Sequence, residues 1–535
     1  MFLLAVSKDN QKESEDKYMI KFKKILALAL VGVLSVSSLV GCGKKSGSKG
    51  GGSETDIEIS YWLSGLGREW LDNMVAAFEE KYPEYKVTIK SSSDVGGVKA
   101  PFGKEDVDSV DLYMANAEYN YEYSEPLNDL LDSKAEGESK TLREKINPSY
   151  LELETASDGN VYELTYGGGA IGFVYNKRLF EEAGVRNLPR TTNELISACD
   201  TLYASGIAPI CHFKTTVSYY NFISDTWRMQ YDGKDYFIKN FYGCTDANGT
   251  SPSKDVFTAK DGRYEVLKVM EKLLTPDYVL TGSNTHEMTT MQTKFLQGEC
   301  AMMVTGGWIG NEMSMSDKMG DFAFMKSPVI SSITDKLATV TEESELRAVI
   351  AAVDKVTDGE EELSAYQDGE NYKVDELSVS AADWEYIYKA RNTVPTNYSG
   401  ETMFIPTYAN AKEGAKEFIR FMYSDEGYKI YTDTLHLPLP LTLDSGELDT
   451  SDWNEFEKDQ LNLINSTVQT ASSYIKGQHP IFYLGGADAY GNEVIFDKFC
   501  AKNKSDRVNA KSAWDKIVAR VEQLYDNTWL ANMGE

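Results

Sequence analysis

The segment KFLQGECAMMVTGGWIG, residues 294–310, places two glycines and a tryptophan directly after a short apolar run. The run from Cys300 to Val304 has the length and the apolar character of a buried strand. Gly306 and Gly307 carry no side chain, so we expect the backbone to turn sharply and to present the ring of Trp308. An indole ring can cover the C–H face of a ring-shaped ligand such as a sugar. We therefore predict that Trp308 binds ligand; the alternative is a core tryptophan.

Two further strand-like segments end in residues of the same chemical kinds. Trp62 closes the segment IEISYWL (57–63), and a turn rich in serine and glycine follows it. Asn116 and Glu118 follow VDLYM (110–114). Amides and carboxylates bind the hydroxyl rim of a sugar, so all three residues are ligand-binding candidates. Core packing for Trp62 and a solvated loop for Asn116 and Glu118 remain the alternatives.

Alternating strand and helix patterns must position these residues. In the first part of the chain, apolar residues at helical spacing follow the strand 57–63, and KVTIK (86–90) then alternates as a strand does. The pattern restarts at 165–185, where a strand runs into a helix, and Thr191 and Glu194 have the spacing of a capping box. We expect further helices near 261–274, 286–297, 411–423 and 512–525. This order predicts an α/β fold, in which ligands bind at strand ends.

The N-terminal segment has the features of a secretion signal. Lys21, Lys23 and Lys24 precede the apolar stretch 25–40, which is too short for a comfortable membrane span. The stretch ends in LVGC, which resembles the lipobox of bacterial lipoproteins. The resemblance implies that residues 1–41 are a signal peptide and that Cys42 receives a lipid and becomes the first mature residue. A cleaved signal followed by an incidental cysteine is the alternative. Residues 42–56 then form a flexible tether, so we expect a membrane-anchored, extracytoplasmic protein.

Length, charge and cysteine usage narrow the class of protein. The chain has 535 residues, which favours two or more domains, and its formal net charge is −29. Such an acidic chain is unsuited to neutralising nucleic-acid phosphates, so we expect no nucleic-acid partner. The five cysteines after Cys42 have no CxxC spacing; we predict buried thiols, and a bridge between Cys199 and Cys211 is the alternative.

No motif of the sequence indicates a cofactor, a metal or a catalytic centre. GGGAIG (167–172) matches the dinucleotide fingerprint, but FVYN follows it instead of a helix start, so we interpret these glycines as a strand and a hinge. The four histidines are scattered, and neither HExxH nor GxSxG occurs. We therefore expect no cofactor, no metal ion and no enzymatic activity.

One block of the chain is strongly acidic. Residues 342–385 contain 14 acidic and three basic residues. Leu346, Val349, Ile350 and Val353 still form an apolar helix face, which predicts a surface helix pair within an insertion at 331–390.

Four segments resemble a known family when they are taken together: GFVYNKRLFEEAGV, LPRTTNELISACDTL, FLQGECAMMVTGGW and ANAKEGAKEFIRFMYSDEGYKIY. They are similar to the family 1, carbohydrate-type extracellular solute-binding proteins of ABC transporters, the group that is like maltose-binding protein. The similarity extends from about residue 57 to the end, except for the insertion and the greater length of this chain.

The resemblance implies a two-lobed, periplasmic-binding-protein-like (type II) α/β fold with a ligand cleft between discontinuous lobes. Lobe 1 would hold residues 57–164 and 391–435, and lobe 2 would hold residues 165–390 and 436–535. Because the insertion and the length depart from the family, the lobe boundaries and the ligand size remain open.

The resemblance also implies roles for individual residues. Trp308 would occupy the sugar-stacking position, and the turn after Trp62 would supply ligand groups. A stacking tyrosine would be Tyr219 or Tyr220, and Trp227 is either a ligand residue or helix core. Tyr166, at the start of the glycine-rich crossing, and Tyr483, in the late loop HPIFYLGG, are further candidates.

The family function would be capture of a sugar or oligosaccharide and its delivery to the permease of an ABC transporter, by a protein that we expect to be a monomer. Two alternatives remain. The same fold could bind a polyamine, a metal chelate or a peptide. A secreted glycoside hydrolase would need two carboxylates that face one glycosidic bond.

Overall fold

The computed structural model of the protein describes residues 53–116, 118, 120–214, 219–312, 319–395, 400–446, 448–472, 476, 478–484 and 493–533. The signal peptide, Cys42 and nearly all of the tether predicted from the sequence therefore lie outside the described residues. No helix in the described part of the chain is long and apolar enough to span a membrane.

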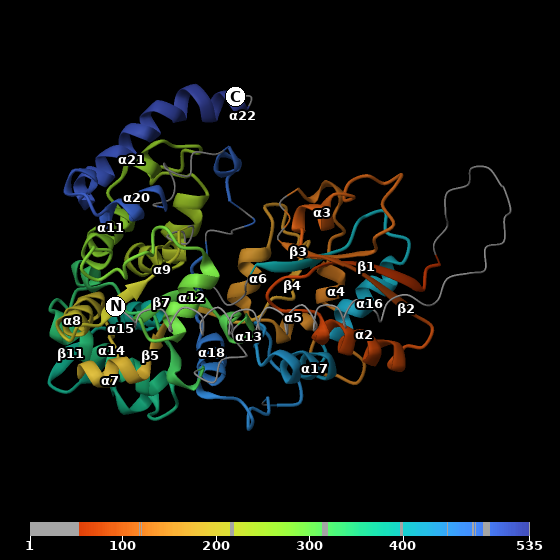
Figure 1. Cartoon of the computed structure of the whole chain (residues 1–535), viewed down its shortest axis with the longest axis horizontal. Coiled ribbons are helices and arrows are strands. Elements are labelled where there is room, and N and C mark those ends of the chain that lie inside the picture. Colours follow the sequence, from red (N-terminus) through yellow and green to blue (C-terminus); the bar gives the residue numbers. More distant parts are fainter. Residues whose placement is uncertain are drawn as a thin grey trace, which may run out of the picture. The chain divides into compact units, whose positions relative to one another are not determined.

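The first of the two main sheets among the described residues has five strands in the order β2-β1-β3-β13-β4. Its strands are β1 (Asp56–Trp62), β2 (Lys86–Ser92), β3 (Leu112–Asn116), β4 (Leu164–Thr165) and β13 (Glu401–Phe404). Strands β1, β2 and β3 are parallel, whereas β13 pairs antiparallel with both of its neighbours. Strand β13 comes from much later in the chain, yet it lies beside β3 (Figure 1). This part of the structure is therefore discontinuous in sequence.

Helices from both ends of this discontinuous part pack together. The helix α2 (Glu69–Lys81) contacts α16 (Lys412–Met422) and α17 (Asp425–Leu435). Phe78 of α2 contacts the rings of Phe418 and Phe421 at centroid distances of 5.2 and 5.8 Å. The remaining helical segments of this part are α3 (Val95–Lys99), η1 (Tyr121–Tyr123), α4 (Asn128–Leu131), α5 (Leu142–Lys145) and α6 (Pro148–Glu154).

The second main sheet has four strands in the described residues, in the order β6-β7-β5-β8. They are β5 (Ile171–Asn176), β6 (Ala208–Cys211), β7 (Cys300–Gly306) and β8 (Phe322–Met325). Strand β5 runs antiparallel to β7 and β8, and β6 runs parallel to β7. Its helices are α7 (Lys177–Ala183), α8 (Thr192–Ala204), α9 (Tyr220–Asp232), α10 (Asp255–Thr258), α11 (Gly262–Leu273), α12 (Met288–Leu296), α13 (Ile309–Glu312), α18 (Glu455–Asn465), α20 (Glu493–Phe499), α21 (Ala510–Leu524) and α22 (Leu530–Met533), with the π-helical η3 (Tyr236–Tyr242) and η9 (Tyr525–Trp529).

Among the described residues, three stretches of chain connect strands or helices of the two main sheets. The first joins β4 to β5 through residues 166–170, and the second leads from β12 (Thr393–Val394), which pairs with β14 (Gln469–Thr470), to β13. The third runs from α17 to α18 through residues 436–454. Strand β12 belongs to the stretch predicted for lobe 1 and β14 to the stretch predicted for lobe 2, so the lobe boundaries stay a prediction.

The sequence located the regular elements closely. The four predicted helices correspond to α11, α12, α16 and α21, and the strand predicted at 110–114 begins two residues later, at Leu112. The Thr191 hydroxyl accepts from the Glu194 amide, but the Glu194 carboxylate binds the Arg190 amide instead of closing a capping box. Cys199, Cys211, Cys244, Cys300 and Cys500 are free and buried, as predicted.

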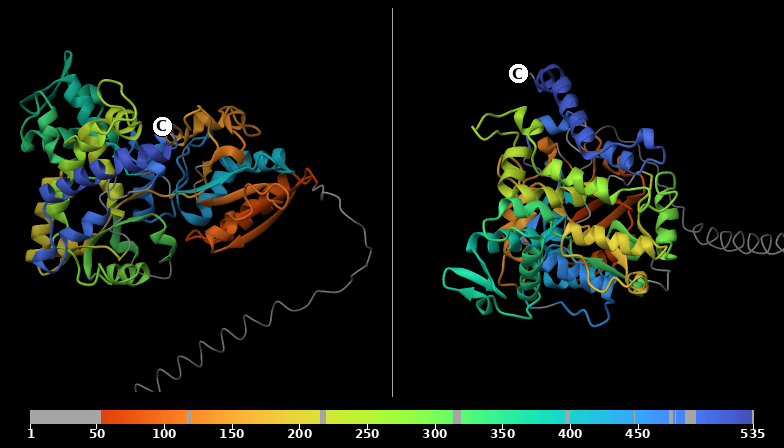
Figure 2. Two further views of the ribbon diagram at one scale, coloured as in Figure 1. Left: turned by 90° about the horizontal axis from the view of Figure 1, so that it is seen from above. Right: turned by 90° about the vertical axis from the view of Figure 1, so that its left-hand side faces the viewer.

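The acidic block 331–390 contains the predicted helix pair, α14 (Glu343–Thr357) and α15 (Ala381–Arg391). Leu346, Val349, Ile350 and Val353 are fully buried, so the predicted apolar face of α14 is confirmed. The sequence missed a small antiparallel sheet, β9 (Gln367–Asp368), β10 (Asn371–Val374) and β11 (Leu377–Val379), whose hairpin projects from the helices around it (Figure 2). Its strands are only two to four residues long, which is too short for a clear alternation in the sequence.

Two buried arginines organise the packing of α9 against α11. The guanidinium of Arg228 lies over the ring of Phe241, 4.1 Å from its centroid. The guanidinium of Arg263 lies over the ring of Trp514 in α21, 5.1 Å from its centroid. Asp232, at the end of α9, accepts a hydrogen bond from the Gly262 amide at 2.9 Å. Burial, reinforced by nearby Asp261, raises the pKa of Asp232 to about 7 in spite of the arginines.

This raised pKa predicts a pH dependence of stability. Because the folded chain holds the Asp232 proton more tightly than the unfolded chain, this group should destabilise the fold as pH rises from about 4 to 7, by at most about 1.4 kcal/mol per pH unit. Asp232→Asn keeps an acceptor for Gly262 and removes the charge, so that contribution should vanish. Urea unfolding midpoints between pH 5 and 8 measure it, and an unchanged pH slope in the variant would contradict the assignment.

Candidate functional site

The structure brings Tyr219 and Trp308 together at the end of β7. Their ring centroids lie 5.9 Å apart with an interplanar angle of 74°, an edge-to-face contact. Tyr219 precedes α9 directly, and its ring also packs on Phe213 at 5.5 Å. Both Tyr219 and Trp308 are half-buried, so each keeps an exposed part of its ring. We call these two residues the aromatic pair.

The two glycines before Trp308 allow close approach of side chains. A Cβ atom on Gly306 would lie 2.0 Å from Cζ3 of Trp308, so the indole ring folds back over the backbone of Gly306. A Cβ atom on Gly307 would lie 1.8 Å from Oε1 of Gln460 on α18. Neither glycine has a positive φ. The sequence analysis attributed these two glycines to a sharp turn of the backbone. The structure adds a second reason, because the side chains of Trp308 and Gln460 leave no room for a Cβ atom at either position.

The turn after β1 lies near the helix that follows Trp308. Trp62 is half-buried at the end of β1. A Cβ atom on Gly65 would lie 3.1 Å from Oε1 of Glu312, the last residue of α13. The turn that follows Trp62 in the first sheet thus meets the segment that carries Trp308 in the second sheet. This is the arrangement that a ligand site between two halves requires.

Glu312 is a candidate that sequence reasoning missed. The Gln292 amide of α12 donates to its carboxylate at 2.7 Å; the residue is exposed, and partial desolvation of the carboxyl raises the pKa of Glu312. A carboxylate so placed can accept hydrogen bonds from hydroxyl groups or pair with a cation. The only signal in the sequence was its position four residues after Trp308, which became meaningful once α13 was known.

Asn116 and Glu118 lie at the end of β3, as expected. Asn116 is exposed, and its backbone carbonyl lies 3.5 Å from Nζ of Lys99. The Glu118 carboxylate forms an ion pair with Lys99 at 2.8 Å, and its backbone amide donates to Glu163 at 3.1 Å. A ligand that bound Glu118 would therefore have to share its carboxylate with a lysine.

A buried ion pair lies behind Glu118. The carboxylate of Glu163 pairs with the ammonium of Lys476, and both side chains are 1% exposed. Lys476 also donates to the backbone carbonyl of Glu118 at 3.1 Å, and the Thr402 hydroxyl donates to Glu163 at 2.5 Å. These bonds fix the end of β3 to β13 and to a late segment of the chain. Removal of either partner of such a pair leaves a buried charge, which is strongly destabilising.

Three other predicted residues lie in the core. Tyr166, Tyr220 and Trp227 are each 0% exposed. Tyr166 stacks on Trp70 at 5.9 Å, and the Trp227 indole donates to the Pro328 carbonyl at 2.8 Å. This placement favours a structural role for all three. Tyr483 ends η7 (Pro480–Tyr483), and its side chain lies outside the described residues.

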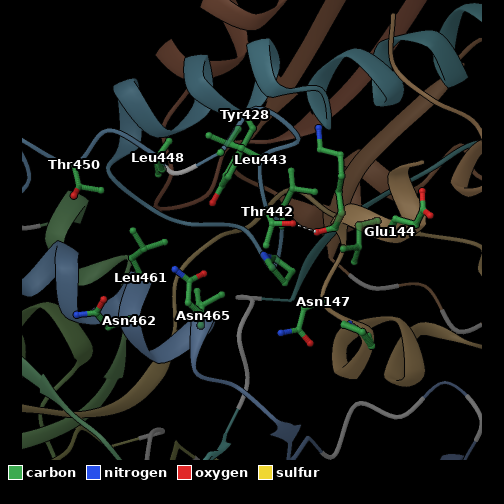
Figure 3. Close-up of a pocket in the computed structure, with 17 residues that line it drawn as sticks. Glu144, Asn147, Tyr428, Thr442, Leu443, Leu448, Thr450, Leu461, Asn462 and Asn465 are labelled. Atoms are coloured by element: carbon green, nitrogen blue, oxygen red, sulfur yellow. Dashed lines mark hydrogen bonds between the residues drawn. The ribbon is translucent and has the colours of Figure 1, made fainter. Parts of the chain in front are cut away.

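A groove of about 590 Å³ lies along the third crossing segment, apart from the aromatic pair. Figure 3 shows Asn147 facing this groove from the start of α6, and Asn462 and Asn465 facing it from α18. The Thr442 hydroxyl donates to the Lys145 carbonyl at 3.1 Å across its floor. None of the residues predicted to bind ligand is among the described residues that line this groove, so the groove is separate from the predicted ligand site.

Solved structures share the fold described above. A solute receptor titled AcbH, with a stated preference for β-D-galactopyranose, has a TM-score of 0.58 at 13% identity, covering 88% of this chain and 98% of its own. RafE from Streptococcus pneumoniae has a TM-score of 0.58 at 14% identity, covering 88% and 99%. At these identities the likeness establishes the two-lobed α/β fold, as predicted.

The family itself follows from a sequence match. The model of the bacterial extracellular solute-binding protein family matches residues 64–429, more than half of the chain. The chain therefore belongs to this family. A relative from Brucella abortus (strain 2308), named only as a binding protein, is 24% identical over 190 residues, 36% of this chain. The match spans about two fifths of the length of that relative.

The close approach at Gly306 gives a direct test of the site geometry. Gly306→Ala should displace the Trp308 ring, because its Cβ would overlap the indole, and should cost about 1–3 kcal/mol as overpacking does. Near-ultraviolet circular dichroism and acrylamide quenching of tryptophan fluorescence report the ring position. Gly320→Ala is the control, since nothing lies within 4 Å of a Cβ there. Wild-type spectra and stability in Gly306→Ala would disprove the packing.

Proposed function

We propose that this protein captures a sugar or an oligosaccharide between its two lobes and delivers it to the permease of an ABC transporter. The observation that carries the proposal is the half-buried aromatic pair, with Glu312 on the same segment as Trp308 and the turn after Trp62 beside Glu312. Exposed ring faces cover the C–H face of a sugar, while carboxylates bind its hydroxyl rim. Structural neighbours titled as receptors for galactopyranose and as a chitin-oligosaccharide binding protein support the same ligand class.

The proposed binding residues are Trp62, Tyr219, Trp308 and Glu312, with Asn116 and Glu118 at the edge of the site. Tyr166, Tyr220 and Trp227 then serve as the packed support beneath them, because they have no exposed surface. Binding without turnover is the proposed activity, since the family is one of solute-binding proteins and the structural neighbour AcbH is titled a solute receptor. A monomer would be sufficient, because one chain supplies both walls of the site.

Tryptophan fluorescence of the full chain, titrated with mono- and oligosaccharides, tests the ligand class. We expect a saturable change with one class of saccharide and a loss of at least about ten-fold in affinity in Trp308→Ala, because the stacking surface is removed. Tyr203→Ala, which truncates an aromatic side chain that is 51% exposed elsewhere, should bind as wild type does.

The outcome separates sugar from the alternative ligands. No response to any saccharide, in folded protein that responds to spermidine or to a peptide, would move the function to another solute class. Glu312→Gln sharpens this distinction: it should weaken a neutral sugar little, whereas it should remove a charge-assisted bond worth about 1.5–3 kcal/mol from a polyamine. Cleavage of a bound oligosaccharide by the protein would instead favour a glycoside hydrolase.

We also propose that Cys42 anchors the protein to the outer face of the cell membrane. The match of LVGC to a lipobox and the secreted lipoprotein from Streptomyces coelicolor among the structural neighbours support this anchor. Cys42→Ser should release the protein from the membrane fraction, because lipid chains supply the membrane affinity. Cell fractionation with mass spectrometry of the N-terminal peptide measures it. A wild-type N-terminus that carries no lipid would contradict the proposal.

A further inference from the structure

A small pocket lies behind the turn that carries Trp308. It has a volume of about 350 Å³, and Gly307 and Asn311 form one wall. Residues 434–437, at the end of α17, form the second wall, and Gln460 of α18 forms the third. Trp308 is not among the described residues that line this pocket. We call it the amide pocket, and it is distinct from the aromatic pair.

The amide pocket contains buried polar atoms without partners. Gln460 is 0% exposed, and neither its Oε1 nor its Nε2 has a hydrogen-bond partner within the described parts of the chain. The same holds for Nδ2 of Asn311. Buried polar side chains are nearly always hydrogen-bonded, and an unsatisfied amide costs about 1–3 kcal/mol. These atoms therefore indicate a bound molecule that supplies donors and acceptors.

The charged groups of the pocket are already engaged. His436 Nδ1 lies 3.1 Å from the Glu457 carboxylate, which also accepts from the Asn454 amide at 2.8 Å. The groups that remain are neutral amides, and Phe456 adds an apolar wall. Neutral amides with no free charge suit an uncharged ligand better than an ion.

Size and chemistry together define the ligand. A hydroxyl group both donates and accepts, so adjacent hydroxyls satisfy the two ends of an amide. The volume of the pocket is far above the roughly 30 Å³ that one water molecule occupies. It lies at the small end of the range for ligand pockets, which is about 300–1,000 Å³. We propose that the amide pocket is a second binding site, for one small polyhydroxylated molecule such as a polyol or a single sugar unit, with Gln460 as its polar anchor.

The amide pocket lies between segments that belong to different main sheets. Residues 434–437 lie at the end of α17, which packs on α2 beside the first sheet, whereas α18 packs on β8 of the second sheet. An occupant would touch segments from both parts and would stabilise the arrangement in which the pocket exists. This inference does not depend on what the aromatic pair binds.

Ligand-observed NMR on the full chain, with glycerol, myo-inositol and glucose as probes, tests the second site. We expect saturable binding of at least one probe to wild type and to Trp308→Ala, and at least about ten-fold weaker binding to Gln460→Leu. Gln460→Leu replaces an unsatisfied amide by an apolar side chain of similar size, so it should fold. Asn311→Ala is the second variant, and it should weaken the same probe if Gln460→Leu proves unstable.

Two results would overturn the proposal. The first is no saturable binding of any probe to wild type. The second is a bound probe that is lost in Trp308→Ala and kept in Gln460→Leu, which assigns the binding to the aromatic pair. Failure of the sugar proposal alone has a different signature, because probe binding would then remain insensitive to Trp308→Ala and sensitive to Gln460→Leu.

Discussion

The contact between two crossing segments is the constraint on which the site depends. The Gly169 amide donates to the Pro438 carbonyl at 2.9 Å, and the Gly168 amide donates to the Tyr431 hydroxyl at 2.9 Å. A Cβ atom on Gly168 would lie 2.7 Å from the Pro438 carbonyl oxygen, so only glycine permits this approach. The glycine cluster that resembles a nucleotide fingerprint is thus a crossing that leads into β5; its role as a hinge stays a prediction.

From this crossing the rest of the architecture follows. Residues 166–170 deliver β5 to the second sheet, β5 pairs with β7, and the end of β7 leads to Trp308. The Gly307 amide donates to the Ala170 carbonyl at 3.0 Å, so the turn before Trp308 is bonded directly to the crossing. A small rotation at the crossing would therefore move the aromatic pair relative to the turn after β1. The coupling requires no long pathway, because the turn before Trp308 is hydrogen-bonded to the crossing itself.

The sequence predicted the regular elements because they follow local rules. Apolar periodicity located α14 and its buried face even within a strongly acidic block, and the glycines around β7 and β5 marked positions of close approach. The resemblance supplied the expectation that residues 391–435 join the first lobe, and the structure pairs β13 of that stretch with β3, which no local pattern contains. Among the site residues, the choice of Tyr219 or Tyr220 depended on the same resemblance, whereas Trp62 and Trp308 were identified from their place at strand ends.

What the sequence could not show is contact between side chains from distant segments. Glu163 and Lys476 look like ordinary surface charges in the sequence, yet they form a buried pair more than 300 residues apart. Three aromatic residues have the types expected of a sugar site, yet they are fully buried and pack in the core: Tyr166, Tyr220 and Trp227. An aromatic residue near a strand end is suited to both places, and only the packing around it decides which one it occupies.

Gln460 connects these arguments. Its Oε1 lies 1.8 Å from where a Cβ of Gly307 would be and 2.9 Å from where a Cβ of Gly169 would be, so one side chain abuts both the crossing and the turn that carries Trp308. A polar group placed there without a partner is costly, and an apolar residue would fill the same space at no such cost. The amide is therefore best explained by what it binds in the pocket beside it. In that case the small molecule would bind beside the crossing. Because Gln460 contacts Gly169 and Gly307, binding would then affect the position of the aromatic pair.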